Sequence, residues 1–81
     1  MTPEQVKQYI EAGLDCAYLQ VEGDGHHFYA TVVSAAFEGK RLIDRHRMVK
    51  EVIASRLASN EIHALSITKA ATPEEWAKLQ G

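Results

Sequence analysis

The sequence has little of what stabilises disulfide scaffolds or anchors a chain in a membrane: one cysteine and no long apolar run. A single cysteine cannot close an intramolecular disulfide, and a lone thiol is typical of a reducing compartment. No apolar stretch approaches the ~20 residues that cross a bilayer. The N-terminus also lacks a basic segment followed by an apolar one. We therefore expect a cytoplasmic protein with no membrane association.

Enzyme motifs are equally scarce. The sequence has no glycine-rich phosphate loop, no GxSxG motif and no Ser, His and Asp spacing typical of a catalytic triad. Glu74 and Glu75 are adjacent at an expected helix start, where the helix dipole already accounts for them. With 81 residues the chain has room for one compact core and no large cleft. We expect a single domain over residues 1–81 that is not an enzyme.

The amino-acid composition is typical of a globular domain, with 46% hydrophobic residues, 25% charged residues and a net charge of -2. Helical spacing occurs three times. Thr2, a proline and Gln5 form a capping-box start and predict a helix over residues 3–12. A second Thr-Pro-Glu start at Thr72 predicts a short last helix. Between them a helix over residues 42–58 is predicted from one stripe of side chains: Leu42, His46, Val49, Ile53 and Leu57.

Alternating apolar and polar residues predict three strands, over residues 16–22, 27–34 and 62–68. The Gly-Asp-Gly sequence at residues 23–25 is typical of a tight turn, so the first two strands should form an antiparallel hairpin. The predicted order is α-β-β-α-β-α. A three-stranded sheet covered on one face by helices is the economical packing, which gives an α+β two-layer sandwich.

The histidines are the first candidates for chemistry. His26 and His27 fall at the hairpin tip, where exposed histidines usually have no specific function. His63 falls in the third strand, where the simpler interpretation is a partly buried histidine with its hydrogen bonds satisfied. If that strand lies beside the hairpin, imidazoles from two segments approach each other. Two ligands hold a metal poorly alone, but paired imidazoles completed by thiolates resemble Rieske-type centres. Cys16 lies at the opposite end of the hairpin, and we expect it to be structural.

The second candidate site is a cluster of basic residues. Only two acidic residues interrupt six cations in the main helix region, a local net charge of +4 that can contact phosphates. The simpler alternative is a solvated helix face, since no aromatic residues interleave. His46 lies on the apolar stripe and is expected to be a structural hydrogen-bonding residue. The basic residues are Lys40, Arg41, Arg45, Arg47, Lys50 and Arg56.

Four sequence blocks, in this order and spacing, resemble the BolA family. They are Phe-Glu-Gly-Lys at residues 37–40, Arg-His-Arg at 45–47, Ile-His-Ala-Leu-Ser-Ile at 62–67 and Thr-Pro-Glu-Glu-Trp at 72–76. The resemblance covers nearly the whole chain. The short Gly-Asp-Gly hairpin that ends in His27-Phe28 is similar to the IbaG-like bacterial branch of that family.

This resemblance implies a fold like the class II KH domain, and it implies a function. Members of the family work with monothiol CGFS-type glutaredoxins and share a [2Fe-2S] cluster with them, in cluster trafficking or maturation and in iron or stress regulation. The family's C-terminal histidine ligand corresponds to His63. The second ligand comes from the hairpin loop and corresponds to His27, with His26 as a competitor. A glutaredoxin cysteine and glutathione complete the ligand set.

The resemblance also implies an alternative function. Some BolA relatives are described as DNA-binding transcriptional regulators of stress response and cell morphology, and here the basic residues Lys40, Arg41, Arg45, Arg47 and Lys50 would contact the DNA. A KH nucleic-acid site normally uses a GxxG loop. This chain has Gly39 but Leu42 in place of the second glycine. We therefore expect cluster binding first and DNA binding second.

Overall fold

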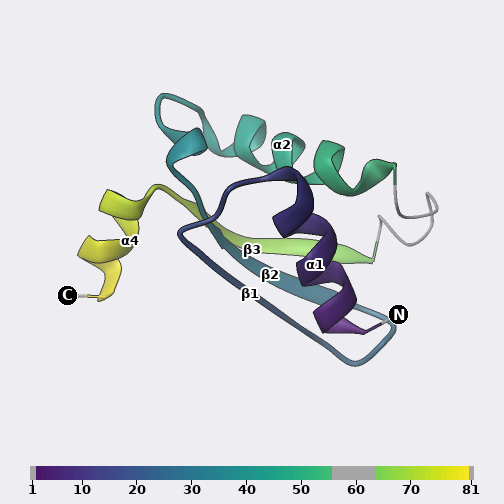
Figure 1. Ribbon diagram of the computed structural model, residues 1–81. Coiled ribbons are helices and arrows are strands. Elements are labelled where there is room, and N and C mark those ends of the chain that lie inside the picture. Colours follow the sequence, from purple (N-terminus) through teal and green to yellow (C-terminus); the bar gives the residue numbers. More distant parts are fainter. Residues whose placement is uncertain (1, 56–63, 81) are drawn as a thin grey trace.

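The computed structural model describes residues 2–55 and 64–80, which form three α-helices, one 3-10 turn and a three-stranded sheet (Figure 1). The α+β class and the α-β-β-α-β-α order are confirmed. The elements in chain order are α1 (Pro3–Gly13), β1 (Tyr18–Gly23), β2 (Phe28–Val33), the 3-10 turn η1 (Ala35–Phe37), α2 (Leu42–Ala54), β3 (Leu65–Ala71) and α4 (Pro73–Gln80).

The sheet has the order β1-β2-β3. β1 pairs with β2 in antiparallel fashion, as the hairpin prediction requires, whereas β3 runs parallel to β2. A parallel pair needs a long crossover connection, and α2 lies on that crossover. α1 and α2 pack against one face of the sheet, and α4 lies at the far end of the molecule from the hairpin tip (Figure 1).

The core lies between these two helices and the sheet. Helical spacing places Val6 and Ile10 of α1 on one buried stripe, and Val49 and Ile53 of α2 on another. Up to Ile67, the strands contribute every second residue to this cluster, as a half-covered sheet should. The strand residues buried in this cluster are Leu19 of β1, then Phe28, Ala30 and Val32 of β2, and then Leu65, Ile67 and Ala70 of β3.

Both Thr-Pro-Glu starts form the predicted caps. Thr2 accepts a hydrogen bond from the backbone N–H of Gln5 at 3.2 Å, and the Gln5 side chain accepts one from Thr2 N–H at 2.9 Å. Thr72 and Glu75 repeat this reciprocal pair at the start of α4, at 3.2 and 2.9 Å. Each box satisfies N–H groups that a helix start otherwise leaves without partners.

The strand boundaries differ from the prediction, most clearly for β3. It covers Leu65–Ala71 and so extends three residues beyond the predicted end at residue 68; residues 62 and 63, where the predicted strand begins, lie outside the described residues. A register shift between Ala30 and Thr31 of β2 leaves Thr68 unpaired, and it places Ala70 opposite Val32. This bulge breaks the simple alternation that the prediction followed, because one extra residue reverses the faces of those beyond it. β1 likewise begins at Tyr18 and not at residue 16.

The buried stripe of α2 also differs from the predicted one. Leu42 is 63% exposed and His46 is half-buried, so neither belongs to the core. Arg45 takes the corresponding buried position one turn before Val49. The helix ends at Ala54, and Leu57, on which the longer prediction rested, lies outside the described residues.

Candidate functional site

The hairpin tip is shaped by one carboxylate and two glycines. Asp24 accepts hydrogen bonds from the backbone N–H groups of His26 and His27 at 2.8 and 2.9 Å. These bonds, that from His27 first, lower the pKa of Asp24 below its usual value. Gly25 has a positive φ of 94°, and a Cβ at Gly23 would collide with the His27 carbonyl oxygen. The turn therefore depends on this Gly-Asp-Gly sequence.

The same turn presents His26 and His27 to solvent. Asp24 binds their backbone groups, so the loop is held through its main chain and the imidazoles are not needed to shape it. Both residues are exposed, as the sequence predicts for a hairpin tip. A neutral imidazole offers one nitrogen lone pair to a metal or a proton donor.

The start of β3 lies directly beside this tip. Phe28, the residue after His27, donates its backbone N–H to the carbonyl oxygen of Ala64 at 2.9 Å. Phe28 also pairs with Leu65 in the parallel register. His63, which precedes Ala64 in the chain, lies outside the described residues. The sequence neighbours of His27 and His63 are thus hydrogen-bonded to each other.

Cys16 stands apart from these residues. It precedes β1, and the hairpin register pairs Tyr18 with Val33 at one end and Gly23 with Phe28 at the other. The half-buried thiol donates a hydrogen bond to the Leu14 carbonyl at 3.4 Å. Burial is the main cause that raises its pKa to about 11, with smaller contributions from Glu11 and Asp15. Such a thiol is a poor nucleophile and a poor metal ligand at neutral pH.

Within residues 2–55 and 64–80, no group of three or more His, Cys, Asp and Glu side chains is arranged to hold a metal ion. The candidate ligand His63 lies outside these residues.

The basic residues of α2 divide into two groups. Arg41 and Arg47 are exposed, and both lie within ion-pair distance of Asp44, at 3.3 and 3.9 Å. Lys40 and Lys50 are also exposed. Arg56 lies outside the described residues. Exposed pairs of this kind contribute little to stability, so these cations remain available to an anionic partner.

Arg45 is different. The sequence predicts it among the basic residues that would contact DNA, but in the structure its side chain is buried. Its side chain is only 10% exposed and bonds Glu75 through both terminal nitrogens, at 2.6 and 3.3 Å. It also donates to the carbonyl oxygens of Ala70 at 3.0 Å and Lys40 at 2.9 Å. The guanidinium therefore joins α2, β3 and α4, and it is not free for DNA. Arg45 lies four and eight residues before Val49 and Ile53, a spacing that indicates burial.

None of the helices in the described part of the chain is long and apolar enough to span a membrane. The fold and the hairpin tip together define a class of small α+β domain, in which a hydrogen-bonded turn presents two histidines beside the start of a parallel strand. Its particular family follows from comparison with known proteins.

The model of the family described as "BolA-like protein" matches residues 7–75. This chain belongs to that family. "Protein BOLA2" of Arabidopsis thaliana is 45% identical over 94% of this chain and 84% of its own length. "Acid stress protein IbaG" of Escherichia coli is 33% identical over 96% and 92%. A solved bolA protein homologue from Coxiella burnetii has a TM-score of 0.83 and 44% identity, over 95% of this chain and 97% of its own.

Proposed function

We propose that this protein is a binding module, not an enzyme, that associates with a monothiol glutaredoxin and shares a [2Fe-2S] cluster with it. His63 and His27 are the proposed ligands from this chain, with His26 as the competitor for the second position. The partner's cysteine and a glutathione thiol complete the set. The proposal follows from family membership and from the arrangement of the hairpin tip.

One observation supports it above the others, namely the hydrogen bond from Phe28 N–H to the Ala64 carbonyl at 2.9 Å. It joins the residue after His27 to the residue after His63. Two segments separated by more than thirty residues are thereby fixed to each other at the hairpin tip. Such a link favours a ligand pair from two segments, because segments already held together lose less entropy when the metal binds.

The exposure of the tip fits a shared cluster. His26 and His27 are exposed, so a partner carrying thiolates can approach them without unfolding any element. The cluster itself supplies electron storage when it is bound. This chain would supply imidazole nitrogens, each of which offers one lone pair to iron.

The test is an anaerobic mixture of this protein with a [2Fe-2S]-loaded monothiol glutaredoxin, followed by visible circular dichroism. We expect the glutaredoxin spectrum to change on addition of the natural chain and to remain unchanged with His63→Ala. His27→Ala and His26→Ala are a matched pair at the tip, and the proposal expects the larger loss for His27→Ala. An unchanged spectrum with the natural chain would refute the proposal.

DNA binding is the second candidate, favoured by the exposed cations of α2. Lys40, Arg41, Arg47 and Lys50 remain exposed, whereas Arg45 is removed from the proposed set by its contact with Glu75. Binding through phosphates must weaken steeply with salt, because neutralised phosphates release counterions. Binding that is insensitive to salt, or that survives Arg41→Ala with Arg47→Ala, would rule this candidate out.

A further inference from the structure

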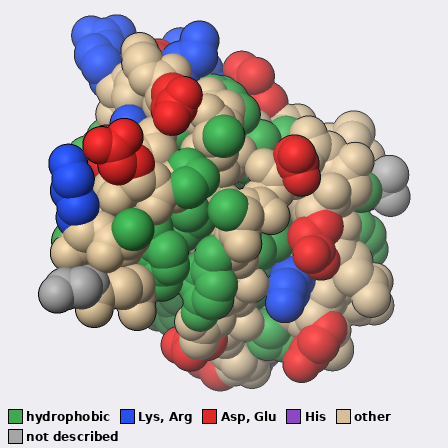
Figure 2. All heavy atoms as spheres, turned by 60° about the vertical axis from the view of Figure 1, so that its left-hand side comes forward, with side chains coloured by type: hydrophobic (Ala, Val, Ile, Leu, Met, Phe, Trp, Pro, Cys, Tyr) green, Lys and Arg blue, Asp and Glu red, His purple; other side chains and the backbone are tan. Residues whose placement is uncertain are grey.

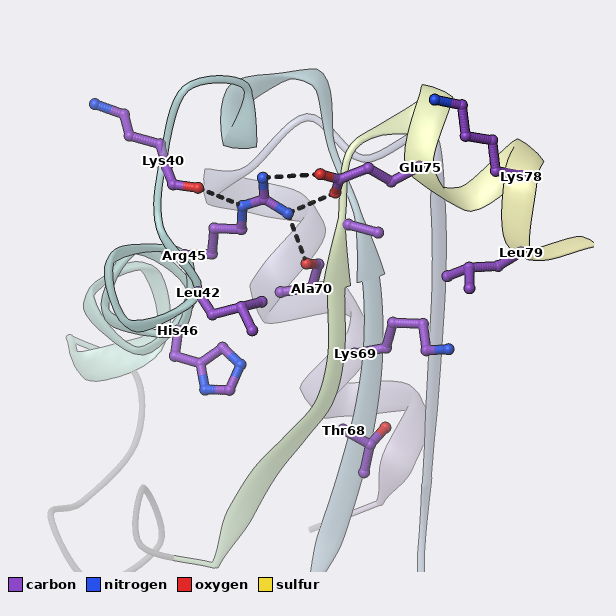
Figure 3. A pocket seen from close by; sticks show the side chains of 11 residues that line it. Lys40, Leu42, Arg45, His46, Thr68, Lys69, Ala70, Glu75, Lys78 and Leu79 are labelled. Atoms are coloured by element: carbon purple, nitrogen blue, oxygen red, sulfur yellow. Dashed lines mark hydrogen bonds and ion pairs between the residues drawn. The ribbon is translucent and has the colours of Figure 1, made fainter.

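A groove whose lining includes neither His26 nor His27 lies at the other end of β3. It has a volume of about 770 Å³ and is enclosed by the start of α2, the second half of β3 and the last turn of α4. In Figure 3, Leu42 and His46 extend from α2 toward the strand, and Leu79 extends toward it from α4. This volume is within the range of about 300–1,000 Å³ that is usual for binding pockets.

The groove is lined by two large apolar side chains that do not belong to the core cluster. Leu42 is 63% exposed and Leu79 is 59% exposed, and both line the groove. The strand between them contributes Ala70 and Ala71, whose small side chains leave the space open. Two large exposed leucines across one groove indicate a surface that binds an apolar group. The face of the molecule at this end shows a band of hydrophobic side chains with charged groups at its margins (Figure 2).

The charged side chains of the groove are mostly basic. Four cations and one carboxylate line it, a net charge of +3 with His46 neutral, although the whole chain carries -2. The carboxylate, Glu75, is already paired with the buried Arg45. The other three lining cations are all exposed: the Lys40 side chain points away from the strand (Figure 3), the Lys69 ammonium lies over the Trp76 ring at 5.9 Å, and the third is Lys78. Of these, Lys78 lies 3.6 Å from Glu74, in an exposed pair.

Arg45 builds the groove and does not itself bind a ligand there. Its bonds to Glu75, Ala70 and Lys40 use four of its five N–H groups and fix α4 against α2 and β3 (Figure 3). The groove is therefore formed before any ligand arrives, which lowers the entropy lost on binding. The bond to the Ala70 carbonyl also occupies the free edge of β3, so a peptide cannot extend the sheet at that point.

We propose that this groove binds an acidic, apolar segment of a partner protein, with a large apolar side chain between Leu42 and Leu79 and carboxylates toward Lys69 and Lys78. Nucleic acid fits it less well, because the lining has no aromatic ring on which a base can stack. The Trp76 ring lies outside the groove lining and is stacked on Tyr18, with ring centroids 5.1 Å apart. This site is independent of the cluster function proposed above.

The test uses fluorescein-labelled short peptides in which Asp or Glu alternates with Leu or Phe. Their binding is measured by anisotropy and mapped by amide chemical shifts in the ¹⁵N-labelled full chain. We expect binding that perturbs the amides of Leu42, Ala70 and Leu79. Leu79→Ser and Lys69→Glu should each weaken it by about tenfold, since one removes apolar contact and the other reverses a charge.

Lys50→Glu is the matched control, because it makes the same charge change on α2 away from the groove lining. We expect it to leave peptide affinity within about twofold, since distant exposed charges are screened. Three results would overturn the proposal: no binding by the acidic peptides, equal binding by peptides with Lys or Arg in place of the acids, or shifts of the groove amides by an oligothymidylate strand alone. The proposed cluster ligands His26 and His27 do not line the groove, so the test is separate from the cluster experiment.

Discussion

At the scale of single residues, Arg45 is the clearest case of a charged side chain with a structural role. Three segments meet at its guanidinium: the start of α2 through the Lys40 carbonyl, β3 through Ala70, and α4 through Glu75. The guanidinium carbon also lies 5.8 Å from the centre of the Phe37 ring. Arginine can do this because its planar group carries five donors in a fixed geometry.

Arg45→Met tests this role. The substitution keeps much of the apolar stem but leaves the Ala70 and Lys40 carbonyls without this donor and Glu75 without its cation. We expect the free energy of unfolding to fall by about 2 kcal/mol, measured by urea denaturation. Arg41→Met, four residues earlier and exposed, should change it by less than about 0.5 kcal/mol. Equal effects of the two substitutions on the free energy of unfolding would contradict a structural role for Arg45.

At the scale of elements, the hairpin tip depends on one side chain. Asp24 accepts two backbone N–H groups, from His26 and His27, and no apolar contact of the core holds this turn. Its pKa is lowered in the folded protein, so its contribution to the turn is complete above the ordinary value near 3.8. That contribution is lost as the pH falls through the lower folded-state pKa.

Asp24→Ala should therefore loosen the tip without unfolding the sheet. We expect faster amide hydrogen exchange at His26 and His27 at neutral pH, with unchanged exchange at Ala30 in the middle of β2. Asp24→Asn keeps an acceptor oxygen, so it should retain part of the protection at His26 and His27. That protection should no longer decrease as the pH falls below the pKa of the carboxyl group, because the asparagine side chain does not titrate. If Asp24→Ala exchanges like the natural chain, the carboxylate does not hold the turn.

The elements that the sequence predicts correctly have local causes. Capping boxes at Thr2 and Thr72 fix two helix starts, and the Gly-Asp-Gly turn fixes the hairpin and the exposure of its histidines. What the sequence misses depends on pairing across the sheet. The bulge at Thr68 changes the pairing toward the end of β3. Arg45 donates its hydrogen bonds to Ala70 and Glu75, which follow it by 25 and 30 positions. Neither the bulge nor these bonds have a local signal, although the spacing of Arg45 from Val49 and Ile53 indicates its burial.

At the scale of the whole molecule, two surfaces lie at opposite ends of the sheet. The hairpin tip adjoins Leu65 at the start of β3, and the groove adjoins Ala70 and Ala71 at its end. The molecule measures 33 × 21 × 19 Å. The two proposed contacts therefore use different ends of the sheet.

The position of α4 links global stability to pH. The side-chain hydrogen bond from Arg45 is the largest cause that lowers the pKa of Glu75, to about 2 from 4.5. Its folded-state pKa is depressed, so its contribution to stability is present above pH 4.5 and is lost as the pH falls toward 2. We expect Glu75→Gln to flatten the decline in urea midpoint over this range. Glu74→Gln, one position earlier, is the control and should leave the decline unchanged.

The central claim is that imidazoles of this chain bind the iron of a cluster shared with a glutaredoxin. The most direct measurement is pulsed electron paramagnetic resonance of the reduced heterodimer, with ¹⁵N-histidine in this chain only. We predict strong ¹⁵N couplings from two ring nitrogens, one of them lost in His63→Ala and the other in His27→Ala. A reduced cluster without ¹⁵N coupling to this chain would contradict the account.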